Sequence, residues 1–506
     1  MESDGVWECC LKPVSASGQA EDRCAELKPC ERFFWRSLPL EHRTGSDIFA
    51  ALFQPKSVGT GSDNIATLLE SPYPLPSGSL PEIATEMARY SICAGAPRVV
   101  EDHIQLWTPA VGNVFSLLEN MGRAAQPQIP EAVGELPFVG GWLGWLGYDC
   151  AWEVERLPWL KDDNLPFPVA FWYEPAEFAV LDHHRQQLWL AAESSELLTR
   201  LVDQLDVLGS IQSDRDALYI DRNIDRSADG KNQTHSLRFD TEQVAFEQAV
   251  TQAKAHIRAG DVFQVNHSLR FQAQTDLPSW AVYKKLHNIN PSPFASYWHT
   301  PWGAVVSCSP ERLVHLKEGK AASRPIAGTR PRGRTQDEDE AIARELIGDR
   351  KERAEHIMLV DLERNDLGRV CKWGSVQVEE LMTVERYSHV MHLVSNVAGE
   401  LDSQHSIAQL IAALFPGGTI TGCPKVRCME IIESLEPVRR SLFYGSCGYL
   451  DRRGRLDLNI LIRTLLMSER TVWGQVGAGI VADSKPEREW HESLQKAQAQ
   501  LLALGL

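Results

Sequence analysis

Short apolar runs separated by turn residues dominate the first part of the chain. From Phe33 to about Ala192 these runs recur as ATLLES, ARYSICAG, HIQLWTP, FVGGWLGWLGYD and FAVLDHHRQQLWLAA. Runs of this length, bounded by turn residues, are typical of β-strands. The region is therefore predicted to be mainly strand, and its many large aromatic rings, among them Trp142, Trp145 and Trp172, are predicted to lie in the core.

Helical patterns appear further along the chain. TEQVAFEQAVTQAKAHIRAG and DEDEAIARELIGDRKERAEHIMLVDLERND carry apolar residues at helical spacing, and Gly260 is predicted to cap the first of these helices. Strands are predicted between and after them in DVFQVNHSLRFQA, GAVVSCSPERLVHLKEG and TVWGQVGAGIVA. Strand-rich sheets with helices packed against them indicate an α+β or mixed α/β protein.

Polar, weakly periodic segments are expected to divide the chain. Residues 1–35 are predicted to be an irregular N-terminal extension, and residues 209–237 a linker or surface loop. Two folded regions, 36–208 and 238–506, remain. The eleven cysteines lack paired metal-ligand spacing and are expected to be reduced thiols; four of them, Cys9, Cys10, Cys24 and Cys30, fall in the extension.

Charge and length exclude several classes of protein. The chain has 506 residues, enough for two to four domains, and a net charge of -17 without a basic stripe, which argues against a general nucleic-acid surface. No apolar run approaches the ~18 residues of a membrane span, and MESDGVWECCLKPVS lacks the pattern of a signal peptide. A cytoplasmic enzyme is therefore expected.

Two pairs of glutamates stand three residues apart on segments predicted to be helical. Glu352 and Glu355 lie in KERAEHIMLVDLERND, and Glu489 and Glu492 in KPEREWHESLQK. Residues three apart share a helical face, so each pair can direct two carboxylates to one point, and Mg²⁺ prefers oxygen ligands. Either pair alone is more typical of a solvated face. Both pairs, taken with their neighbouring segments, indicate one metal site.

Further segments have the composition of an anion site. In PGGTITGCPKVRCMEII, Gly417, Gly418 and Thr419 precede a helix expected to begin near Pro424. The backbone N–H groups of such a loop, exposed at the positive end of a helix, can bind a carboxylate. The others are RPIAGTRPRG with Gly328 and Thr329, VGAGIVADS with Gly477, Ala478 and Gly479, LNILIRTL with Arg463 in an apolar strand, and ERYSHVMHLVSN with His389 and His392. Each segment alone is equally typical of a structural turn, a paired arginine or a core histidine.

Six segments together resemble, in order and spacing, the chorismate-utilising family of anthranilate synthase and aminodeoxychorismate synthase large subunits. They are RPIAGTRPRG, DLERNDLGRV, YSHVMH, PGGTITGCPKVRCMEII, LIRTL and GAGIVADSKPEREWHES. The resemblance is dense over residues 240 to 500 and looser earlier, through LLES, ARYSI and GGWLGWLGYD. It implies an α+β fold of large antiparallel β-sheets packed face to face, with helices outside.

The resemblance also implies a reaction and the residues that perform it. Family members use Mg²⁺ to bind the ring carboxylate of chorismate, and ammonia attacks the ring as the C4 hydroxyl departs. The implied magnesium ligands are Glu352, Glu355, Glu489 and Glu492. The implied substrate contacts are Gly328, Thr329, Thr419, Arg463, Gly477, Ala478, Gly479 and Lys496. The implied catalytic residues are Glu311 in SPERL, His389 and Lys496.

The source of ammonia is expected to be a second protein. The chain has no nucleophilic cysteine in a Gly-rich elbow with a downstream His-x-Glu, the pattern of a glutamine amidotransferase. The resemblance therefore implies a separate glutaminase subunit that docks and channels ammonia, with free ammonia as a slower substitute.

Two products are compatible with these motifs. Many aminodeoxychorismate synthases carry a nucleophilic lysine where PIAGT has Ala327, so this residue favours anthranilate synthase, which serves tryptophan biosynthesis. Val265 and Asn266 in GDVFQVN resemble the aminodeoxychorismate branch, which serves para-aminobenzoate and folate synthesis. GGWLGWLGYD, DLERNDLGRV and PGGTITGCPK do so as well, and the opening usual in anthranilate synthases is missing before LLES. We predict aminodeoxychorismate synthase with direct addition of ammonia; Ala327 speaks against isochorismate synthase.

The first region also contains a predicted tryptophan pocket. LLES and ARYS resemble the family's regulatory pocket, with Leu69, Glu70, Ser71, Arg89, Tyr90 and Ser91 as its candidate residues. A buried strand end is the alternative interpretation. A noncatalytic subunit that binds chorismate or tryptophan is disfavoured because all four candidate metal acids and Lys496 are present.

Overall fold

Two antiparallel β-sheets form the centre of the protein. The computed structural model describes residues 32–55, 64–71, 86–124, 129–216, 236–387 and 390–506. In the larger sheet the strand order is β1 (Phe34–Pro39), β10 (Gln187–Ala192), β9 (Glu177–Asp182), β3 (Tyr90–Ala94), β2 (Ala66–Glu70), β13 (Phe294–Thr300), β14 (Gly303–Ser309), β23 (Thr464–Ser468), β24 (Thr471–Ile480), β12 (Gln264–Gln274) and β11 (Arg238–Phe239). A short strand, β20 (Gly422–Cys423), also pairs with β12.

The smaller sheet contains strands from both halves of the chain as well. Its order is β17 (Ile326–Pro331), β19 (Val390–Glu400), β16 (Lys320–Arg324), β15 (Arg312–Lys317), β22 (Leu456–Asn459), β21 (Ser446–Asp451), β7 (Gly141–Leu146), β8 (Ala170–Tyr173) and β6 (Leu106–Trp107), with β18 (Gln377–Arg386) beside β19. The two predicted regions are joined by β2–β13 pairing in the larger sheet and β7–β21 pairing in the smaller one. Residues 36–208 and 238–506 therefore share both sheets.

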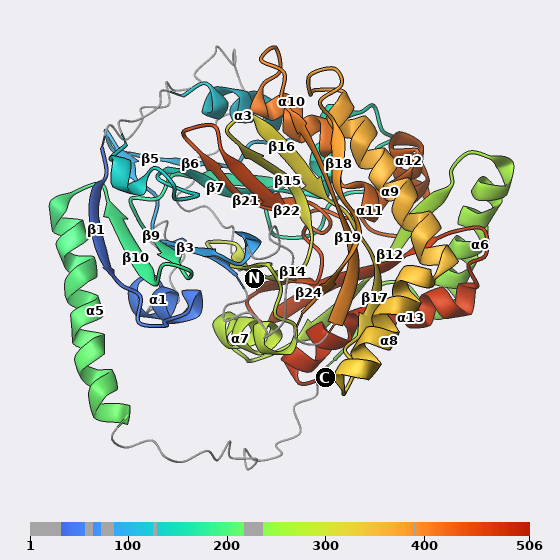
Figure 1. Ribbon diagram of the computed structural model, residues 1–506. Helices are drawn as coiled ribbons and strands as arrows, with labels where there is room; N and C mark the ends of the chain where they lie inside the picture. The colour runs from blue at the N-terminus through green and yellow to red at the C-terminus, as the bar shows by residue number, and fades with distance from the viewer. Residues whose placement is uncertain (1–31, 56–63, 72–85, 125–128, 217–235, 388–389) are drawn as a thin grey trace, which may run out of the picture.

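Helices cover the outside of the sheets (Figure 1). They include α1 (Gly45–Leu52), α5 (Ser195–Asp216), α6 (Gln243–Ala259), α7 (Ser279–Ile289) and α13 (Pro486–Leu504) on the larger sheet, and α8 (Gln336–Gly348), α9 (Arg350–Gly368) and α10 (Ile407–Leu414) on the smaller one. The predicted fold class, with antiparallel sheets packed face to face and helices outside, is confirmed. None of the helices in the described part of the chain is long and apolar enough to span a membrane.

Large aromatic rings fill the space between the sheets. Trp142, Trp145 and Trp172 are each at most 1% exposed, which confirms their predicted place in the core. Trp145 of the smaller sheet meets Trp298 of the larger sheet edge to face, with ring centroids 5.8 Å apart. Such contacts add to the area that the two inner faces bury. Trp159, another ring of this region expected in the core, is 54% exposed, so that prediction was wrong for it.

Three predicted elements have different boundaries in the structure. The helix expected over 337–366 is two helices, because the side chain of Asp349 accepts hydrogen bonds from the N–H groups of Lys351 and Glu352 and starts α9 anew. The strand expected over 303–319 is two strands in different sheets, β14 and β15. Helix α5 continues to Asp216, into the segment expected to be a linker. The predicted cap at Gly260 is confirmed, with φ +82°.

Most of the predicted N-terminal extension, including its four cysteines, lies outside the described residues. Strand β1 already begins at Phe34, before the predicted end of the extension at residue 35. The seven cysteines within the described residues are all free thiols, as expected.

Candidate active site

Two segments that cross between the sheets lie next to each other. One joins β14 to β15 through Glu311, and the other joins β22 to β23 through residues 460–463. The Ile460 N–H donates to the Glu311 carbonyl at 3.0 Å, and the Cys308 N–H donates to the Arg463 carbonyl at 3.2 Å. The crossovers therefore hold Glu311 and Arg463 together at the seam between the sheets.

Glu311 is a buried carboxyl group, 5% exposed. Burial raises its pKa to about 8; the Thr419 hydroxyl and the Arg463 charge act to lower the pKa, and the carboxyl of Glu363 acts to raise it. A carboxyl with a pKa this high keeps its proton near neutral pH and can serve as a general acid. This environment suits the catalytic role predicted for Glu311.

Arg463 lies in the crossover before β23, and the expectation of a strand position was wrong. Its φ of +51° is in the left-handed region, so the backbone turns there and does not continue a strand. The guanidinium donates to Asn290 Oδ1 at 3.1 Å. Its remaining N–H groups make it suited to hold a carboxylate of a ligand.

Thr329 and His392 form a second part of the seam, on paired strands β17 and β19. Thr329 Oγ1 and His392 Nδ1 share a hydrogen bond of 3.0 Å. Burial, followed by the charge of Arg463, lowers the pKa of His392 to about 3, so the imidazole is neutral. The sequence interpretation of His392 as a buried histidine with a partner agrees with this. His389, the predicted catalytic histidine, lies outside the described residues.

Glu352 faces a turn at Gly328. The pairing of β17 with β19 is irregular between Ala327 and Thr329, and Gly328 has φ +64°. A Cβ at Gly328 would lie 3.1 Å from Glu352 Oε2, so glycine lets this carboxylate approach the strand. Arg330 reaches the same carboxylate, with Nη1 3.4 Å from Oε1.

Glu355 is tied to the larger sheet through a glutamine. Gln264 Nε2 donates to Glu355 Oε1 at 2.7 Å. Burial raises the pKa of Glu355; the bond from Gln264 acts to lower the pKa, and the Glu352 carboxylate acts to raise it. A Cβ at Gly479 would lie 2.2 Å from Gln264 Nε2 and 3.3 Å from Glu355 Oε1. Glycine at position 479 thus leaves the space that this contact needs.

The second acid pair lies on α13. Lys496 Nζ is 2.9 Å from Glu492 Oε1 and donates to the Gly477 carbonyl at 3.1 Å. Burial acts to raise the pKa of Glu492, but the Lys496 charge lowers it overall. Burial raises the pKa of Glu489, and the Glu492 carboxylate adds to the increase. Ala478, between the two glycines, is fully buried, so only its backbone could contact a ligand.

The two acid pairs share the electrostatic influence of two lysines. The positive charges of Lys351 and Lys496 act on the pKa values of Glu355, Glu489 and Glu492 alike. Within the described ranges, however, no group of three or more His, Cys, Asp or Glu side chains is arranged so that it could hold a metal ion. The four glutamates supply the carboxylate oxygens that Mg²⁺ prefers. A bound cation would also offset the repulsion between the two like charges within each pair. Their role as magnesium ligands stays a prediction.

Thr419 lies in a short helix, α11 (Gly418–Thr421), followed by β20 and then by α12 (Lys425–Leu435). The predicted start of a helix near Pro424 is confirmed, although Thr419 belongs to the preceding turn of helix. Asn266 Nδ2 donates to the Thr419 carbonyl at 3.2 Å, while Asn266 Oδ1 is buried with no hydrogen-bond partner among the described residues. This oxygen can accept a hydrogen bond from a ligand.

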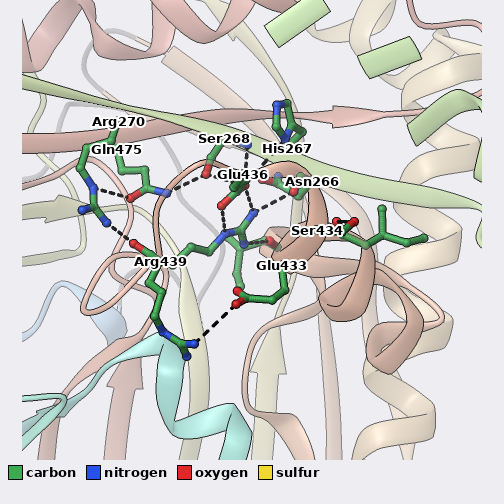
Figure 2. Close-up of polar contacts among 12 residues, drawn as sticks. Asn266, His267, Ser268, Arg270, Glu433, Ser434, Glu436, Arg439 and Gln475 are labelled. Carbon is green, nitrogen blue, oxygen red and sulfur yellow. Dashed lines mark hydrogen bonds and ion pairs between the residues drawn. The ribbon is translucent and has the colours of Figure 1, made fainter. Parts of the chain in front are cut away.

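A buried polar network supports the Asn266 strand and the end of α12 (Figure 2). The Glu436 carboxylate accepts from the Ser268 N–H at 2.8 Å and from its hydroxyl at 2.7 Å. Gln475 Nε2 donates to Ser268 Oγ at 2.8 Å. Arg440 donates to Glu436 at 2.7 Å and to the Asn266 carbonyl at 2.8 Å. The network therefore fixes the backbone that presents Asn266.

The residues predicted to hold tryptophan lie around β2 and β3. Three of them, Leu69, Glu70 and Tyr90, line a cavity of about 80 Å³. Glu70 already accepts hydrogen bonds from Tyr283 at 2.7 Å and from the Ser46 N–H at 2.6 Å. Arg89 donates to Asp182 at 2.7 Å, and the hydroxyls of Ser71 and Ser91 are 3.4 Å apart. Tryptophan binding there stays a prediction.

Sequence reasoning missed several members of the site. Gln264 stands in the GDVFQVN motif, but no neighbouring residue in the sequence indicates its contact with Glu355. Asn290, the partner of Arg463, is distant in sequence. Glu363 lies in DLERNDLGRV and is not among the predicted site residues, yet it is 5% exposed and its charge acts on the pKa of Glu311. Only the packing of α9 onto the seam reveals it.

Known proteins are similar to this chain over most of its length. The sequence profile of the chorismate binding enzyme family matches residues 86–502. An "anthranilate synthase component I-like protein" of Synechocystis sp. is 56% identical over 490 residues, covering 95% of this chain and 93% of the relative. Aminodeoxychorismate synthase component 1 of Bacillus subtilis is 45% identical over 370 residues, covering 73% of this chain and 78% of the relative.

A solved structure shares the fold as well. Anthranilate synthase component I from Streptococcus pneumoniae superposes with a TM-score of 0.68 at 30% identity, covering 85% of this chain and 94% of that chain. The motifs in the sequence, the two sheets and the similar proteins agree, and the chain therefore belongs to the family of chorismate-binding enzymes.

Proposed function

We propose that this enzyme is component I of an aminodeoxychorismate synthase. It exchanges the C4 hydroxyl of chorismate for an amino group from ammonia and keeps the enolpyruvyl group. The observation that carries the reaction class is Glu311, a buried acid with a raised pKa at the seam that also presents Arg463. Such an acid can protonate a leaving hydroxyl, which then departs as water.

The surrounding residues have distinct roles in this proposal. Arg463 binds a carboxylate of chorismate through its free N–H groups, and the peptide groups of Gly477 and Gly479 line the same approach. Thr329, oriented by its bond to His392, supplies a hydroxyl contact. Mg²⁺, held by Glu352, Glu355, Glu489 and Glu492, would supply positive charge for the ring carboxylate and for hydroxyl departure.

Asn266 favours the C4 product. It is the last residue of GDVFQVN, whose ending in Val265 and Asn266 resembles the aminodeoxychorismate branch. Its side chain bonds the Thr419 carbonyl, and its Oδ1 offers an acceptor to an N–H of ammonia or of the new amine. The 45% identity to a relative named aminodeoxychorismate synthase component 1 supports the same branch. Ala327 excludes a covalent lysine, so ammonia must add directly.

Ammonia comes from a separate glutaminase subunit in this proposal. The similar proteins are named as component I or component 1, which fits a chain that acts with a second subunit. With the purified chain alone, ammonium salts should support turnover and glutamine should not. Turnover with glutamine alone would contradict this requirement.

Anthranilate synthase is the second candidate. It is favoured by Ala327, by the name of the Synechocystis relative and by the fold match to a solved anthranilate synthase component I. Chromatographic identification of the product from purified protein, chorismate, Mg²⁺ and ammonium decides between them. We expect 4-amino-4-deoxychorismate; anthranilate as the sole product would overturn the proposal.

A further inference from the structure

A second buried carboxyl group lies behind Glu311 and has no role in the function proposed above. Glu363 on α9 is 5% exposed, and its Oε2 has no hydrogen-bond partner among the described residues. Burial without a partner for a carboxylate oxygen is costly, so such an atom in a native protein calls for an occupant or a function. The surroundings of Glu363 indicate a function.

On its inner side Glu363 adjoins the catalytic seam. A Cβ at Gly418 would lie 3.6 Å from Glu363 Oε1, so the carboxyl touches the turn that presents Thr419. Its charge acts on the pKa of Glu311. Both carboxyls are therefore buried near the α11 turn that carries Thr419.

Neighbours of Glu363 on α9, among them Leu362 and Asp366, line an open cavity. Asp366, one turn further along α9, bonds Lys425 Nζ at 2.7 Å, and this ion pair forms part of the lining of a cavity of about 600 Å³. Burial raises the pKa of Glu363 well above its usual range, as does the charge of Asp366, while Lys425 acts to lower it. Leu362, which contacts Gly418, lines the same cavity. Leu362 and Asp366 thus connect the cavity lining with the surroundings of Glu363.

The cavity has the composition for a small cation. Its lining contains three carboxylates and two cationic side chains, namely Glu155, Asp361 and Asp366 against Lys425 and Arg369. A surplus of negative charge raises the local concentration of a cation such as ammonium.

We propose that Glu363 receives the ammonium ion that reaches the site through this cavity and takes a proton from it, releasing ammonia beside Glu311 and Thr419. The inference rests on the proposed function. Ammonium gives ammonia and protonated Glu363, and ammonia then forms the C–N bond while Glu311 protonates the departing hydroxyl to water. Transfer of the proton from Glu363 to Glu311 restores both groups, so chorismate and ammonium give the ammonium form of the product and water.

The test compares ammonium use by the full chain and by Glu363→Gln across pH. The variant depends on ammonia already free in solution, which increases about tenfold per pH unit below the pKa of ammonium. We expect kcat/KM for total ammonium to fall by roughly a hundredfold near pH 7, with the loss shrinking as pH rises. The KM for chorismate should stay within about twofold.

Two further variants separate this role from a structural one. Glu363→Asp keeps a carboxyl and should recover part of the activity with the pH response of the wild type. Glu340→Gln, an exposed acid on α8, should match the wild type. A loss in Glu363→Gln that is equal at every pH, or no loss, would overturn the proposal.

A variant at the cavity provides an independent measurement. Val426 lies in the cavity lining and is 37% exposed, so Val426→Trp should narrow the cavity without touching Glu363. We expect a higher KM for ammonium and an unchanged KM for chorismate; an unchanged KM for ammonium would count against the route. If the product proves to be anthranilate, the proposed function fails while these ratios still decide the role of Glu363, since both products need ammonium.

Discussion

The protonation of Glu311 follows from burial at the seam between the sheets. Its carboxyl has a pKa raised to about 8 and is protonated below that pH. Because the proposed role requires the protonated form, kcat should fall as pH rises through about 8. Glu311→Gln should lower kcat by about 10² to 10⁴ and remove this alkaline limb. A pH–rate profile at saturating chorismate and ammonium measures both, and an unchanged limb in the variant would assign it to another group.

Glycine at position 479 leaves the space that Gln264 of the larger sheet needs to contact Glu355 of the first acid pair. Gly479→Ala would place a methyl group 2.2 Å from Gln264 Nε2 and displace it from Glu355. We expect at least a tenfold loss of kcat/KM for chorismate and a higher Mg²⁺ requirement. Titration of activity with Mg²⁺ measures this.

Gly368→Ala is the matched control for that substitution. A Cβ at Gly368, at the end of α9, would meet nothing within 4 Å. Its Mg²⁺ titration should coincide with that of the wild type. Equal behaviour of the two variants would show that the space at position 479 is irrelevant to the acid pair.

At the scale of elements, the buried Glu436–Arg440 ion pair joins the C-terminal end of α12 to β12 through hydrogen bonds to Ser268 and to the Asn266 carbonyl. Removing Glu436 would leave the Arg440 guanidinium buried without its carboxylate, and an uncompensated buried charge costs about 3–5 kcal/mol. Glu436→Ala should therefore lower the free energy of unfolding by that amount in urea titrations. Activity should fall as well, because Arg440 also holds the Asn266 carbonyl.

A surface ion pair on the same helix supplies the comparison. Arg427 bonds Glu430 at 2.7 Å, but its side chain is 43% exposed, and such pairs contribute about 0–1 kcal/mol. Arg427→Ala should thus change the unfolding free energy by less than about 1 kcal/mol. Similar losses for the two variants would mean that burial does not set the strength of the Glu436 pair.

At the scale of the whole molecule, neither half of the chain completes a sheet. A fragment of residues 238–506 would expose the edge of β13 that pairs with β2 and the edge of β21 that pairs with β7. Unpaired edges promote aggregation. We expect this fragment to be insoluble or to lack a cooperative thermal transition. Co-expression with residues 1–216 should restore a folded complex, and a stable monomeric fragment 238–506 would refute the prediction.

The sequence by itself determined the family and the sheet-rich fold, and it named most residues of the candidate site, whose roles stay predictions. Glycines, the acid pairs, Arg463 and Thr419 are recognisable because their spacing along the chain is local information. The cap at Gly260 and the buried tryptophans were predictable for the same reason: helix ends and apolar runs depend on neighbouring residues.

Only the tertiary structure decided how those residues meet. The run over 303–319 reads as one strand, but its halves enter different sheets, which is what places Glu311 at the seam. The sharing of both sheets by the two regions could not be seen, because strand pairing between distant segments leaves no local pattern. Gln264, Asn290 and Glu363 were missed for the same reason. Their roles come from burial and contact across the fold, and these are properties of packing rather than of spacing along the chain.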